Sequence, residues 1–363
     1  MGGAERITTE LANLLSEDYH VTVVDFSGEN YFYYDLNSSI NLENSVPRTN
    51  FKRKVVRKLR NNLYKINKKD INPLIIYKEQ VEALINICKN NKYDVLIVSQ
   101  GELTALIPYI KARISKLKII AWQHSSYYIY VNNYYRKYLK YYLEGVQKAD
   151  HIVCLTKNDQ KFFEEKNSKS ICIYNPLTLK DPIISDIQNQ NIIFVGRIEI
   201  EVKGLDYLIE LAKNINPDWK IQVAGEGYDT EVFKDLIKKN GLENTIIMHG
   251  KLQEKELKHF YSTGSIFIST SRWEGFGLVI TEAMSSGLPI ISFDNLGPSE
   301  ILAHGQFGVL VEKNNLEVFS RELKCLMDSQ EQRKEWQQKS LLRARDFNNE
   351  NIIRVWKSIL NSL

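Results

Sequence analysis

Short apolar segments alternate with longer, helix-like segments along almost the whole chain of 363 residues. The apolar segments are rich in β-branched residues and bounded by polar turns, a pattern typical of parallel strands covered by helices. We expect strands at residues 21–25, 95–98, 118–121, 151–155, 192–195, 221–224, 245–248, 265–269 and 289–292. The alternation therefore predicts an α/β protein built on doubly wound parallel sheets.

The length of the chain favours two such domains rather than one. Residues 175–190 contain two prolines among polar residues, which is typical of a linker. We expect an N-terminal domain at residues 1–178, a linker at 179–190 and a C-terminal domain at 191–345, with helix continuing to the end of the chain. Two facing sheets of this kind would leave a ligand cleft between the domains.

Composition and charge exclude several classes of protein. Hydrophobic residues make up 43% and charged residues 25% of the chain, as in ordinary globular proteins. A net charge of +4 is too small to indicate nucleic-acid binding. The four cysteines lie far apart without a C-x-x-C motif, no apolar stretch approaches 18 residues, and no signal peptide opens the sequence. These features predict a protein that is made and kept in the cytosol.

Two carboxylates surround a glycine-rich turn directly after the strand predicted at 265–269. The turn holds Gly275 and Gly277, with Glu274 before it and Glu282 in the helix expected to follow. Backbone N–H groups exposed at such a strand end can bind anions or hydroxyl-rich ligands. Carboxylates would repel phosphate alone, but they accept hydrogen bonds from vicinal sugar hydroxyls. The turn thus favours a ligand that carries sugar hydroxyls, with a purely structural role at the helix start as the alternative.

Two cations follow the strand predicted at 192–195. Arg197 comes directly after Gly196, and Lys203 follows a short excursion of the chain. A guanidinium fits phosphate with two hydrogen bonds and a lysine adds a compact charge, so both could converge on one diphosphate. The alternative is a surface arginine and lysine at an ordinary strand–helix loop. Gly225 begins a third turn of this kind, but the third glycine of a dinucleotide fingerprint is absent there.

Seven short motifs are spread over nearly the whole chain. They are Gly-Gly-Ala-Glu-Arg at 2–6, Trp-Gln-His-Ser at 122–125, Ala-Asp-His-Ile-Val at 149–153, Tyr-Asn-Pro at 174–176, Phe-Val-Gly-Arg…Lys-Gly-Leu at 194–205, Ala-Gly-Glu-Gly at 224–227 and Glu-Gly-Phe-Gly-Leu…Glu-Ala-Met-Ser-Ser-Gly-Leu-Pro-Ile at 274–290. In identity and order they resemble the retaining glycosyltransferases of family four. The resemblance implies the GT-B fold, with two Rossmann-like domains and a C-terminal helix at 346–363 that packs back on the N-terminal domain.

The resemblance also implies roles for individual side chains. Arg197 and Lys203 would bind the diphosphate of a nucleotide-sugar donor and stabilise the departing charge. Glu274 would contact the donor sugar near its reacting face, and Glu282 would hold the ribose diol. His124 would lie across the cleft near the sugar, although a lone histidine after an apolar strand can also be structural.

The family further places glycine-rich backbone around the donor. The corresponding substrate-binding positions are Gly3, Gly196, Gly225, Gly275, Phe276, Gly277 and Leu278. Gly2 would join Gly3 in an N-terminal loop close to the phosphates. Because the sequence has neither an Asp-x-Asp nor a His-Glu-x-x-His motif, we expect no metal and no cofactor, with the two cations neutralising the leaving phosphate instead.

Two segments bear on the acceptor. Residues 51–69 hold nine basic and no acidic side chains. As a helix this segment would carry one apolar stripe, made of Val55, Val56, Leu59, Leu63 and Ile66. Residues 127–142 hold eight of the 20 tyrosines, interleaved with three cations. As a helix this second segment would present one broad face, made of Tyr134, Tyr135, Tyr138, Leu139 and Tyr142.

Basic amphipathic surface with aromatic residues favours an anionic membrane surface or a lipid-diphosphate acceptor. The alternative is a solvated basic helix over a tyrosine-rich core. Single-stranded nucleic acid would also suit cations and aromatic rings, but the resemblance makes a nucleic-acid partner unexpected.

Taken together, these features and the resemblance predict a metal-independent glycosyltransferase that moves a sugar from a nucleotide-diphosphate sugar to a saccharide acceptor. That the transfer retains the anomeric configuration is implied by the resemblance. We expect a lipid-linked acceptor in bacterial surface polysaccharide biosynthesis (capsule, exopolysaccharide or O-antigen), and a cytoplasmic protein that is peripheral on the inner face of the cell membrane. The alternatives are a transferase with a soluble or protein acceptor, and a non-catalytic nucleotide-sugar-binding partner subunit.

The amino terminus departs from the family pattern. In the family, the motif at 2–6 follows an apolar first strand that lies centrally in the N-terminal sheet, whereas only Met1 precedes it here. We therefore expect the N-terminal sheet to lack this strand, either because the true start lies upstream or because the segment is absent.

Overall fold

The computed structural model describes residues 3–363, and the chain forms two compact units. The first unit comprises residues 1–176 and 349–363, and the second comprises residues 177–348. Every strand pairing in the described residues is parallel. This agrees with the α/β architecture that the alternating sequence pattern predicts.

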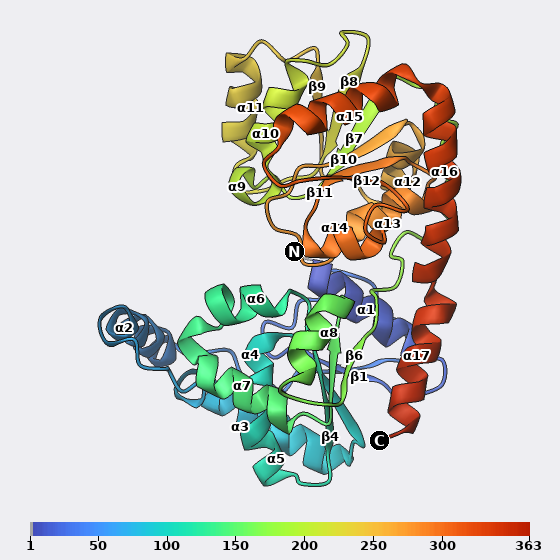
Figure 1. Cartoon of the computed structure of the whole chain (residues 1–363). Coiled ribbons are helices and arrows are strands. Elements are labelled where there is room, and N and C mark those ends of the chain that lie inside the picture. Colours follow the sequence, from blue (N-terminus) through green and yellow to red (C-terminus); the bar gives the residue numbers. More distant parts are fainter. Residues whose placement is uncertain (1–2) are drawn as a thin grey trace. The chain divides into compact units, whose positions relative to one another are not determined.

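The first unit contains a four-stranded and a two-stranded parallel sheet (Figure 1). The larger sheet has the order β3-β4-β5-β6, with bounds β3 (Val95–Val98), β4 (Lys118–Trp122), β5 (His151–Cys154) and β6 (Ser170–Cys172). The smaller sheet pairs β1 (Thr22–Val24) with β2 (Asn41–Glu43). In the described residues β3 is therefore an edge strand, and β1 pairs with β2 rather than with the larger sheet.

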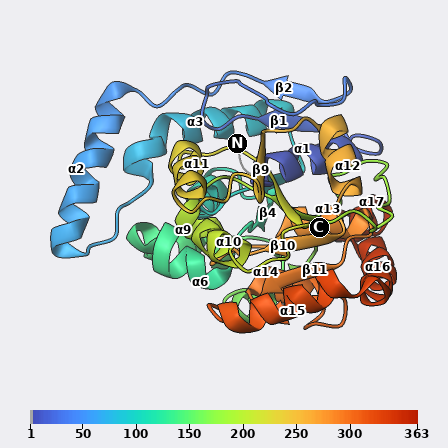
Figure 2. The ribbon, with the colours of Figure 1, turned by 90° about the horizontal axis from the view of Figure 1, so that it is seen from above.

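Helices surround these sheets. Their bounds are α1 (Gly3–Leu15), α2 (Phe51–Asn67), α3 (Leu74–Asn91), α4 (Gly101–Thr104), α5 (Ile107–Arg113), α6 (Tyr127–Ile129), the π-helix η1 (Tyr130–Tyr134), the 3₁₀-helix η2 (Arg136–Tyr138), α7 (Leu139–Lys148), α8 (Lys157–Glu164) and α17 (Asn349–Asn361). The core lies between the larger sheet and its helices, where Ile119 of β4, Ile152 of β5 and Val146 of α7 are fully buried. Helix α2 extends along the periphery of this unit in both Figure 1 and Figure 2.

The last helix of the chain belongs to this first unit. Helix α17 packs on α1, and Trp356 is fully buried with its ring centroid 5.1 Å from that of Trp122. At the last residue of α17, the hydroxyl of Tyr19 donates a hydrogen bond of 3.0 Å to the side chain of Asn361. Residues more than 200 positions apart in the chain thus share one core.

Residues 127–142 do not form the single helix expected from the sequence. The backbone passes from α6 through η1 and η2 into α7, so the five predicted residues do not share one face. Tyr130, Tyr138 and Tyr142 are buried, and the rings of Tyr135 and Tyr142 stack at 5.1 Å. The predicted tyrosine face is therefore wrong, because most of these rings stabilise the core of the unit instead of covering its surface.

The second unit is built on one six-stranded parallel sheet with the order β12-β11-β10-β7-β8-β9. Its strands are β7 (Asn191–Val195), β8 (Lys220–Ala224), β9 (Ile246–Gly250), β10 (Ile266–Ser269), β11 (Ile290–Phe293) and β12 (Val309–Val311). Its helices are α9 (Ile200–Lys203), α10 (Leu205–Ala212), α11 (Thr230–Lys239), α12 (Glu254–Ser262), α13 (Leu278–Ser285), α14 (Leu296–Ile301), α15 (Leu316–Asp328), α16 (Gln330–Ala344) and the 3₁₀-helix η3 (Arg345–Phe347). Buried residues of β7, β8, β10 and α10 form its core.

The segment predicted as a linker, residues 179–190, is part of the second unit. Ile187 is buried, and its carbonyl accepts a hydrogen bond of 3.3 Å from the buried Arg333 of α16. Ser185 donates its hydroxyl proton to the carbonyl of Gly264, just before β10. These contacts hold the segment against α16 and against the residue that precedes β10.

Candidate functional site

The strand order of the second unit creates a topological switch point between β7 and β10. The chain runs from β7 to β8 and β9 on one side, then returns to β10 on the other side of β7 and continues to β11 and β12. Loops at the carboxyl ends of two such neighbouring strands diverge, and open α/β sheets bind their ligands in the crevice this creates. The two most promising motifs of the sequence follow β7 and β10.

Lys203 and Glu274 meet at this switch point. Lys203 ends α9, after β7, and Glu274 lies in the loop after β10. Their side chains form an ion pair of 2.6 Å between Nζ and Oε2, and they are only 14% and 15% exposed. The structure thus brings together two residues 71 positions apart that the sequence singled out separately.

Gly204 explains why Lys203 lies so close to the loop after β10. This glycine ends α9 with a φ of +62°, and a Cβ built on it would stand 2.1 Å from the carbonyl oxygen of Thr270. The hydroxyl of Thr270 donates to the carbonyl of Lys203 at 2.9 Å. Backbone contact at this distance is possible only for glycine, which fixes the lysine against the second loop.

Arg272 anchors the Glu274 loop on the opposite side. It donates two hydrogen bonds to Asp206, at 2.8 and 2.6 Å, and its guanidinium lies 3.9 Å from the ring centroid of Tyr207. Burial raises the pKa of Asp206, but the hydrogen bonds and charge of Arg272 outweigh it and hold that pKa below its usual value. Sequence reasoning missed this anchor, because no local spacing connects Asp206 on α10 with an arginine 66 residues later.

A second anchor comes from the loop after β11. The buried side chain of Asn295 donates to the carbonyl of Ser271 at 2.6 Å, and the Ser271 hydroxyl lies 3.4 Å from Glu274. Asn295 was also missed, and its only sequence signal is its position after a predicted strand. Three neighbouring strand ends therefore hold the Glu274 carboxylate in place.

The predicted backbone contacts Gly275, Phe276, Gly277 and Leu278 lie at the entry to α13. Gly277 has a φ of +108° and immediately precedes the helix, so the backbone turns sharply there. The side chain of Phe276 is buried, 6.1 Å from the ring of Phe347. Ile280 donates its amide to the carbonyl of Gly277 at 2.8 Å, which leaves the amides of Leu278 and Val279 as the ones at this helix start that suit an anion or a hydroxyl. Phe276 contributes packing.

Glu282 lies inside α13 and is 1% exposed. One of its carboxylate oxygens accepts from the hydroxyl of Thr178, and the other accepts from the hydroxyl of Tyr261 at 2.9 Å. The predicted ribose contact is therefore buried and engaged by two protein hydroxyls in this structure.

Arg197 lies after β7, as predicted, but it does not join the Lys203–Glu274 pair. Its side chain is 57% exposed, and its guanidinium forms an ion pair of 2.8 Å with Glu199. Gly196 lies closer to the pair, since a Cβ built on it would be 3.8 Å from Cε of Lys203. Gly225 is pressed against Gly196, with a Cβ position only 1.8 Å from the carbonyl oxygen of Gly196. Close packing against Gly196 therefore requires a glycine at position 225, whether or not Gly225 also binds the donor as predicted.

The remaining predicted residues belong to the first unit. His124 follows β4, its Nε2 lies 2.8 Å from the hydroxyl of Ser99, and its ring centroid is 4.4 Å from that of Trp122. Burial lowers the pKa of His124 to about 3, so the ring is neutral near pH 7. Gly3 begins α1, and Gly2 lies outside the described residues.

Two further properties concern residues 3–363 as a whole. No group of three or more histidine, cysteine, aspartate or glutamate side chains is arranged to hold a metal ion in this part of the chain. In the same residues, none of the helices combines the length and the apolar character that crossing a membrane requires. The expectation of metal-independent chemistry stays a prediction.

Comparison with known proteins covers nearly the whole chain. Residues 1–180 match the model of Glycosyltransferase Family 4, and residues 181–342 match that of Glycosyl transferases group 1. An uncharacterized glycosyltransferase of Haemophilus influenzae is 30% identical over 99% of this chain and 96% of its own length. The amylovoran biosynthesis glycosyltransferase AmsD of Erwinia amylovora is 28% identical over the same shares of the two chains.

A solved structure supports the fold. HepE of Anabaena, in complex with UDP, matches all of this chain over 97% of its own length, with a TM-score of 0.77 and 16% sequence identity. Together these comparisons confirm the resemblance drawn from the seven motifs. The chain is therefore a glycosyltransferase of family 4, and its two Rossmann-like units are those of the GT-B fold.

Proposed function

We propose that this glycosyltransferase moves a sugar from a nucleoside-diphosphate sugar to a saccharide acceptor, with retention of anomeric configuration and without a metal ion. The observation that carries the proposal is the Lys203–Glu274 ion pair at the switch point between β7 and β10. A cation for phosphate and a carboxylate for sugar hydroxyls lie side by side there, as an activated sugar requires.

Breaking the bond between a sugar and a diphosphate builds negative charge on the leaving phosphate. The ammonium group of Lys203 has three donors, so it can keep its bond to Glu274 and still donate to a phosphate oxygen. Because the pair is mostly buried and held by Gly204, Arg272 and Asn295, it needs little reorganisation during the reaction. Lys203 therefore stabilises the leaving group, and Glu274 orients the sugar.

Arg197 and Glu282 have to change partners to play their predicted roles. Arg197 is exposed and can turn from Glu199 toward a diphosphate, which forms two strong hydrogen bonds with a guanidinium. Glu282 would have to release Thr178 or Tyr261 to accept from a ribose diol. The amides at the start of α13 need no such exchange.

Release of free nucleoside diphosphate from a panel of nucleotide sugars tests the donor half of the proposal. Lys203→Ala and Glu274→Ala should each lower the rate by roughly 10²–10³-fold, as removal of one preorganised charged group typically does. Lys213→Ala is the matched control, because Lys213 is an exposed lysine that pairs with Glu210 on the surface.

Three outcomes of this assay would count against the proposal. Unchanged turnover in both active-site variants would remove the site assignment. No release by the wild type with any donor would leave a non-catalytic nucleotide-sugar-binding subunit as the better description. Loss of activity in EDTA, restored by a divalent cation, would overturn metal independence.

We further propose that the acceptor is lipid-linked and that the enzyme works at the inner face of a bacterial cell membrane, in surface polysaccharide biosynthesis. The similarity to AmsD, a glycosyltransferase of amylovoran biosynthesis, supports the pathway. Helix α2 supports the membrane location, because none of its residues is buried and its sequence holds nine cations when counted to residue 69.

The acceptor can be identified by following the transferred sugar. With a radiolabelled donor and bacterial membranes, a lipid-linked acceptor carries the label into an organic solvent phase. Label that stays in the aqueous phase, on a soluble saccharide or a protein, would favour the alternative transferase and overturn the lipid-linked acceptor. The Lys203→Ala variant controls for label moved by other enzymes.

A further inference from the structure

Helix α2 exposes most of its large apolar side chains instead of packing them against the rest of the unit. Five large apolar side chains on it are exposed, with exposed fractions from 41% to 82%; they are Phe51, Val55, Leu59, Leu63 and Ile66. We call these five residues the apolar stripe. At 100° per residue they occupy one side of the helix, whereas Arg53 and Tyr64, which contact the rest of the unit, lie on another. The stripe agrees with the sequence prediction except that Val56 is half-buried and Phe51 joins it.

Polar contacts, together with the packing of the half-buried Tyr64 ring against a small cluster of Ile71, Ile76 and Tyr138, tether this helix. Arg53 forms an ion pair of 2.8 Å with Glu79 of α3 and donates to the carbonyl of Ile75 at 2.7 Å. Near the other end, the hydroxyl of Tyr64 donates to the carbonyl of Arg136 at 3.2 Å. Helices of globular proteins usually gain their stability by burying an apolar face, which α2 does not do here.

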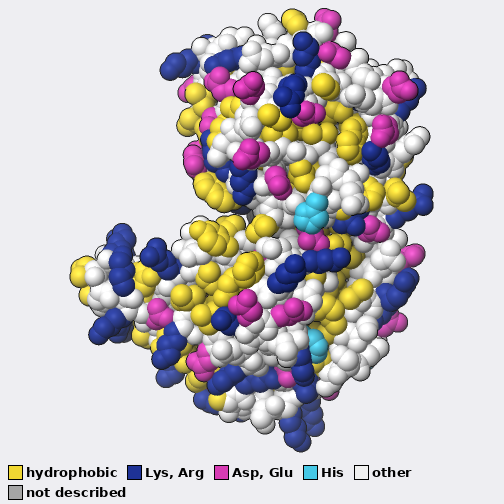
Figure 3. Space-filling model, viewed as in Figure 1, with side chains coloured by type: hydrophobic (Ala, Val, Ile, Leu, Met, Phe, Trp, Pro, Cys, Tyr) yellow, Lys and Arg dark blue, Asp and Glu magenta, His cyan; other side chains and the backbone are white. Residues whose placement is uncertain are grey.

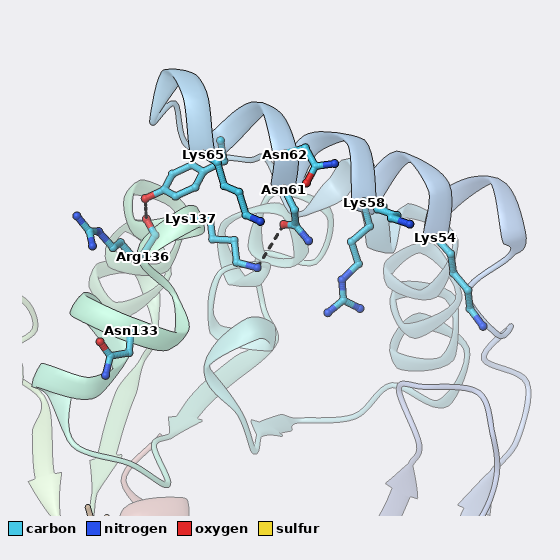
Figure 4. A pocket seen from close by; sticks show the side chains of 10 residues that line it. Lys54, Lys58, Asn61, Asn62, Lys65, Asn133, Arg136 and Lys137 are labelled. Atoms are coloured by element: carbon cyan, nitrogen blue, oxygen red, sulfur yellow. Dashed lines mark hydrogen bonds between the residues drawn. The ribbon is translucent and has the colours of Figure 1, made fainter. Parts of the chain in front are cut away.

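A basic groove lies beside the apolar stripe, between α2 and the segment 133–137 (Figure 4). It has a volume of about 620 Å³, and its lining is Lys54, Arg57, Lys58, Asn61, Asn62, Tyr64, Lys65, Asn133, Arg136 and Lys137. Six of these ten residues are cations and none is acidic. Figure 3 shows Lys and Arg side chains gathered over α2 together with hydrophobic ones.

In the part of the chain that the structure describes, none of the six groove cations forms an ion pair with a carboxylate. Among residues 3–363, the ion pairs of α2 consist of Arg53 with Glu79, and Arg53 is not part of the groove. Lys137 instead donates to the amide oxygen of Asn61 at 3.2 Å, across the groove. Six cations held close together without counter-charges repel one another, so an anionic ligand would stabilise this arrangement.

We propose that α2 is a membrane-contact element: its apolar stripe lies in the interface of an anionic lipid bilayer, and the basic groove beside it takes the lipid phosphates. This inference rests on the proposed function. It deepens that function by assigning the membrane contact to a defined groove and stripe. Charge complementarity and the exposed apolar side chains together favour a lipid surface over a soluble anion, because a soluble anion would leave the apolar stripe in water.

Vesicle co-sedimentation of the full chain tests this assignment. The probes are vesicles of phosphatidylglycerol with phosphatidylcholine, and vesicles of phosphatidylcholine alone. The wild type should bind the anionic vesicles and release them as salt rises. A groove variant (Lys54→Glu, Lys58→Glu and Lys65→Glu) should bind at least about 100-fold more weakly, and a stripe variant (Leu59→Ser, Leu63→Ser and Ile66→Ser) at least about 10-fold more weakly.

A matched charge control separates local from global effects. The variant with Lys234→Glu, Lys238→Glu and Lys239→Glu changes the net charge of the chain by the same amount as the groove variant, on exposed positions of α11. It should bind vesicles as the wild type does. Because all substituted residues are exposed, each variant should keep the wild-type melting temperature within a few degrees.

Three results would overturn the proposal: a wild type that ignores anionic vesicles, a groove variant that binds like the wild type, or equal losses in the groove and α11 variants. Inorganic pyrophosphate that binds the groove of a chain that does not bind vesicles would assign the groove to a soluble anion instead. Nucleoside diphosphate release by the wild type without vesicles tests the proposed function separately. A chain that releases it but ignores vesicles keeps the glycosyl transfer and loses the groove assignment together with the membrane location. A chain that binds vesicles but releases none keeps the groove assignment and loses the glycosyl transfer.

Discussion

At the scale of single residues, Arg272 anchors the loop that carries Glu274. Its two hydrogen bonds to Asp206 and its stacking on Tyr207 use the planar, forked shape of a guanidinium. A lysine could keep the charge but neither the second hydrogen bond nor the stacking. Arg272 is therefore a positioning residue for Glu274.

Arg272→Lys is expected to lower donor turnover by about 10–100-fold, because a shift of about 1 Å in a substrate-orienting group has effects of this size. The loss should appear in kcat more than in the affinity for free nucleoside diphosphate, because the proposed role of Glu274 is to orient the sugar. Arg321→Lys, on α15 at an arginine whose side chain is 64% exposed, is the control. Wild-type kcat in Arg272→Lys would show that the loop after β10 holds its shape without this anchor.

His124 makes the stability of the first unit depend on pH. Burial lowers its pKa from the usual 6.5 to about 3, and burial also lowers the pKa of His151. Between these limits the unfolded chain binds a proton that the folded chain does not, so stability falls as the pH drops from about 6.5 toward 3. The stability that the neutral ring supports is fully present above pH 6.5.

His124→Gln should therefore reduce the slope of melting temperature against pH between pH 7 and pH 4.5, measured by thermal denaturation. His20→Gln, at an exposed position, should leave the slope unchanged. Parallel pH profiles for the wild type and His124→Gln would mean that His124 takes up its proton in the folded chain as readily as in the unfolded one.

At the scale of elements, the loops after β7 and β8 are packed backbone to backbone. Gly225 has a φ of +146°, and its Cβ position lies 1.8 Å from the carbonyl oxygen of Gly196. Both the backbone conformation and the close approach exclude any other residue. The packing of these two strand ends therefore determines where Gly196 and, beyond it, Lys203 lie.

Gly225→Ala should lower the free energy of unfolding by at least about 2 kcal/mol and reduce donor turnover, since both strain and overlap oppose the new methyl group. Gly241→Ala is the matched control: it also has a positive φ, of +67°, but nothing lies within 4 Å of its Cβ position. It should lose only about 1 kcal/mol. Urea denaturation of both variants makes the comparison, and equal losses would show that overlap with Gly196 is relieved without cost.

At the scale of the whole molecule, the C-terminal helix connects the end of the chain to the first unit. Trp356 of α17 is fully buried against Trp122, which directly precedes the Gln123–His124 segment. Removing such a ring leaves a cavity in the core to which both chain segments of the first unit contribute.

Trp356→Ala should reduce the free energy of unfolding of the first unit by about 3–5 kcal/mol, measured by circular dichroism during urea denaturation. Val355→Ala, next to it and 38% exposed, should cost less than about 1 kcal/mol. Similar losses in the two variants would mean that α17 adds little to the core of this unit.

Several features of this protein follow from its sequence alone. All nine predicted strands occur, within two residues of their expected ends, because short runs rich in β-branched residues and bounded by polar turns favour strands over helices. The three strands that the sequence did not reveal, β2, β6 and β12, have only three residues each and too little periodic signal. The family motifs depend on local residue order, so the sequence also sufficed to recognise them.

Other features were decided only by tertiary structure, since they depend on residues far apart in the chain. Lys203 and Glu274 meet because β10 inserts beside β7, which no local pattern specifies. From the sequence, the tyrosines of residues 127–142 could lie on the surface or in the core. In the structure the helix is interrupted and Tyr142 is buried, so these residues contribute to the core. Local propensity determines which segments form helices and strands. Which side chains meet is determined by burial and strand order, because these depend on the packing energy of the whole unit.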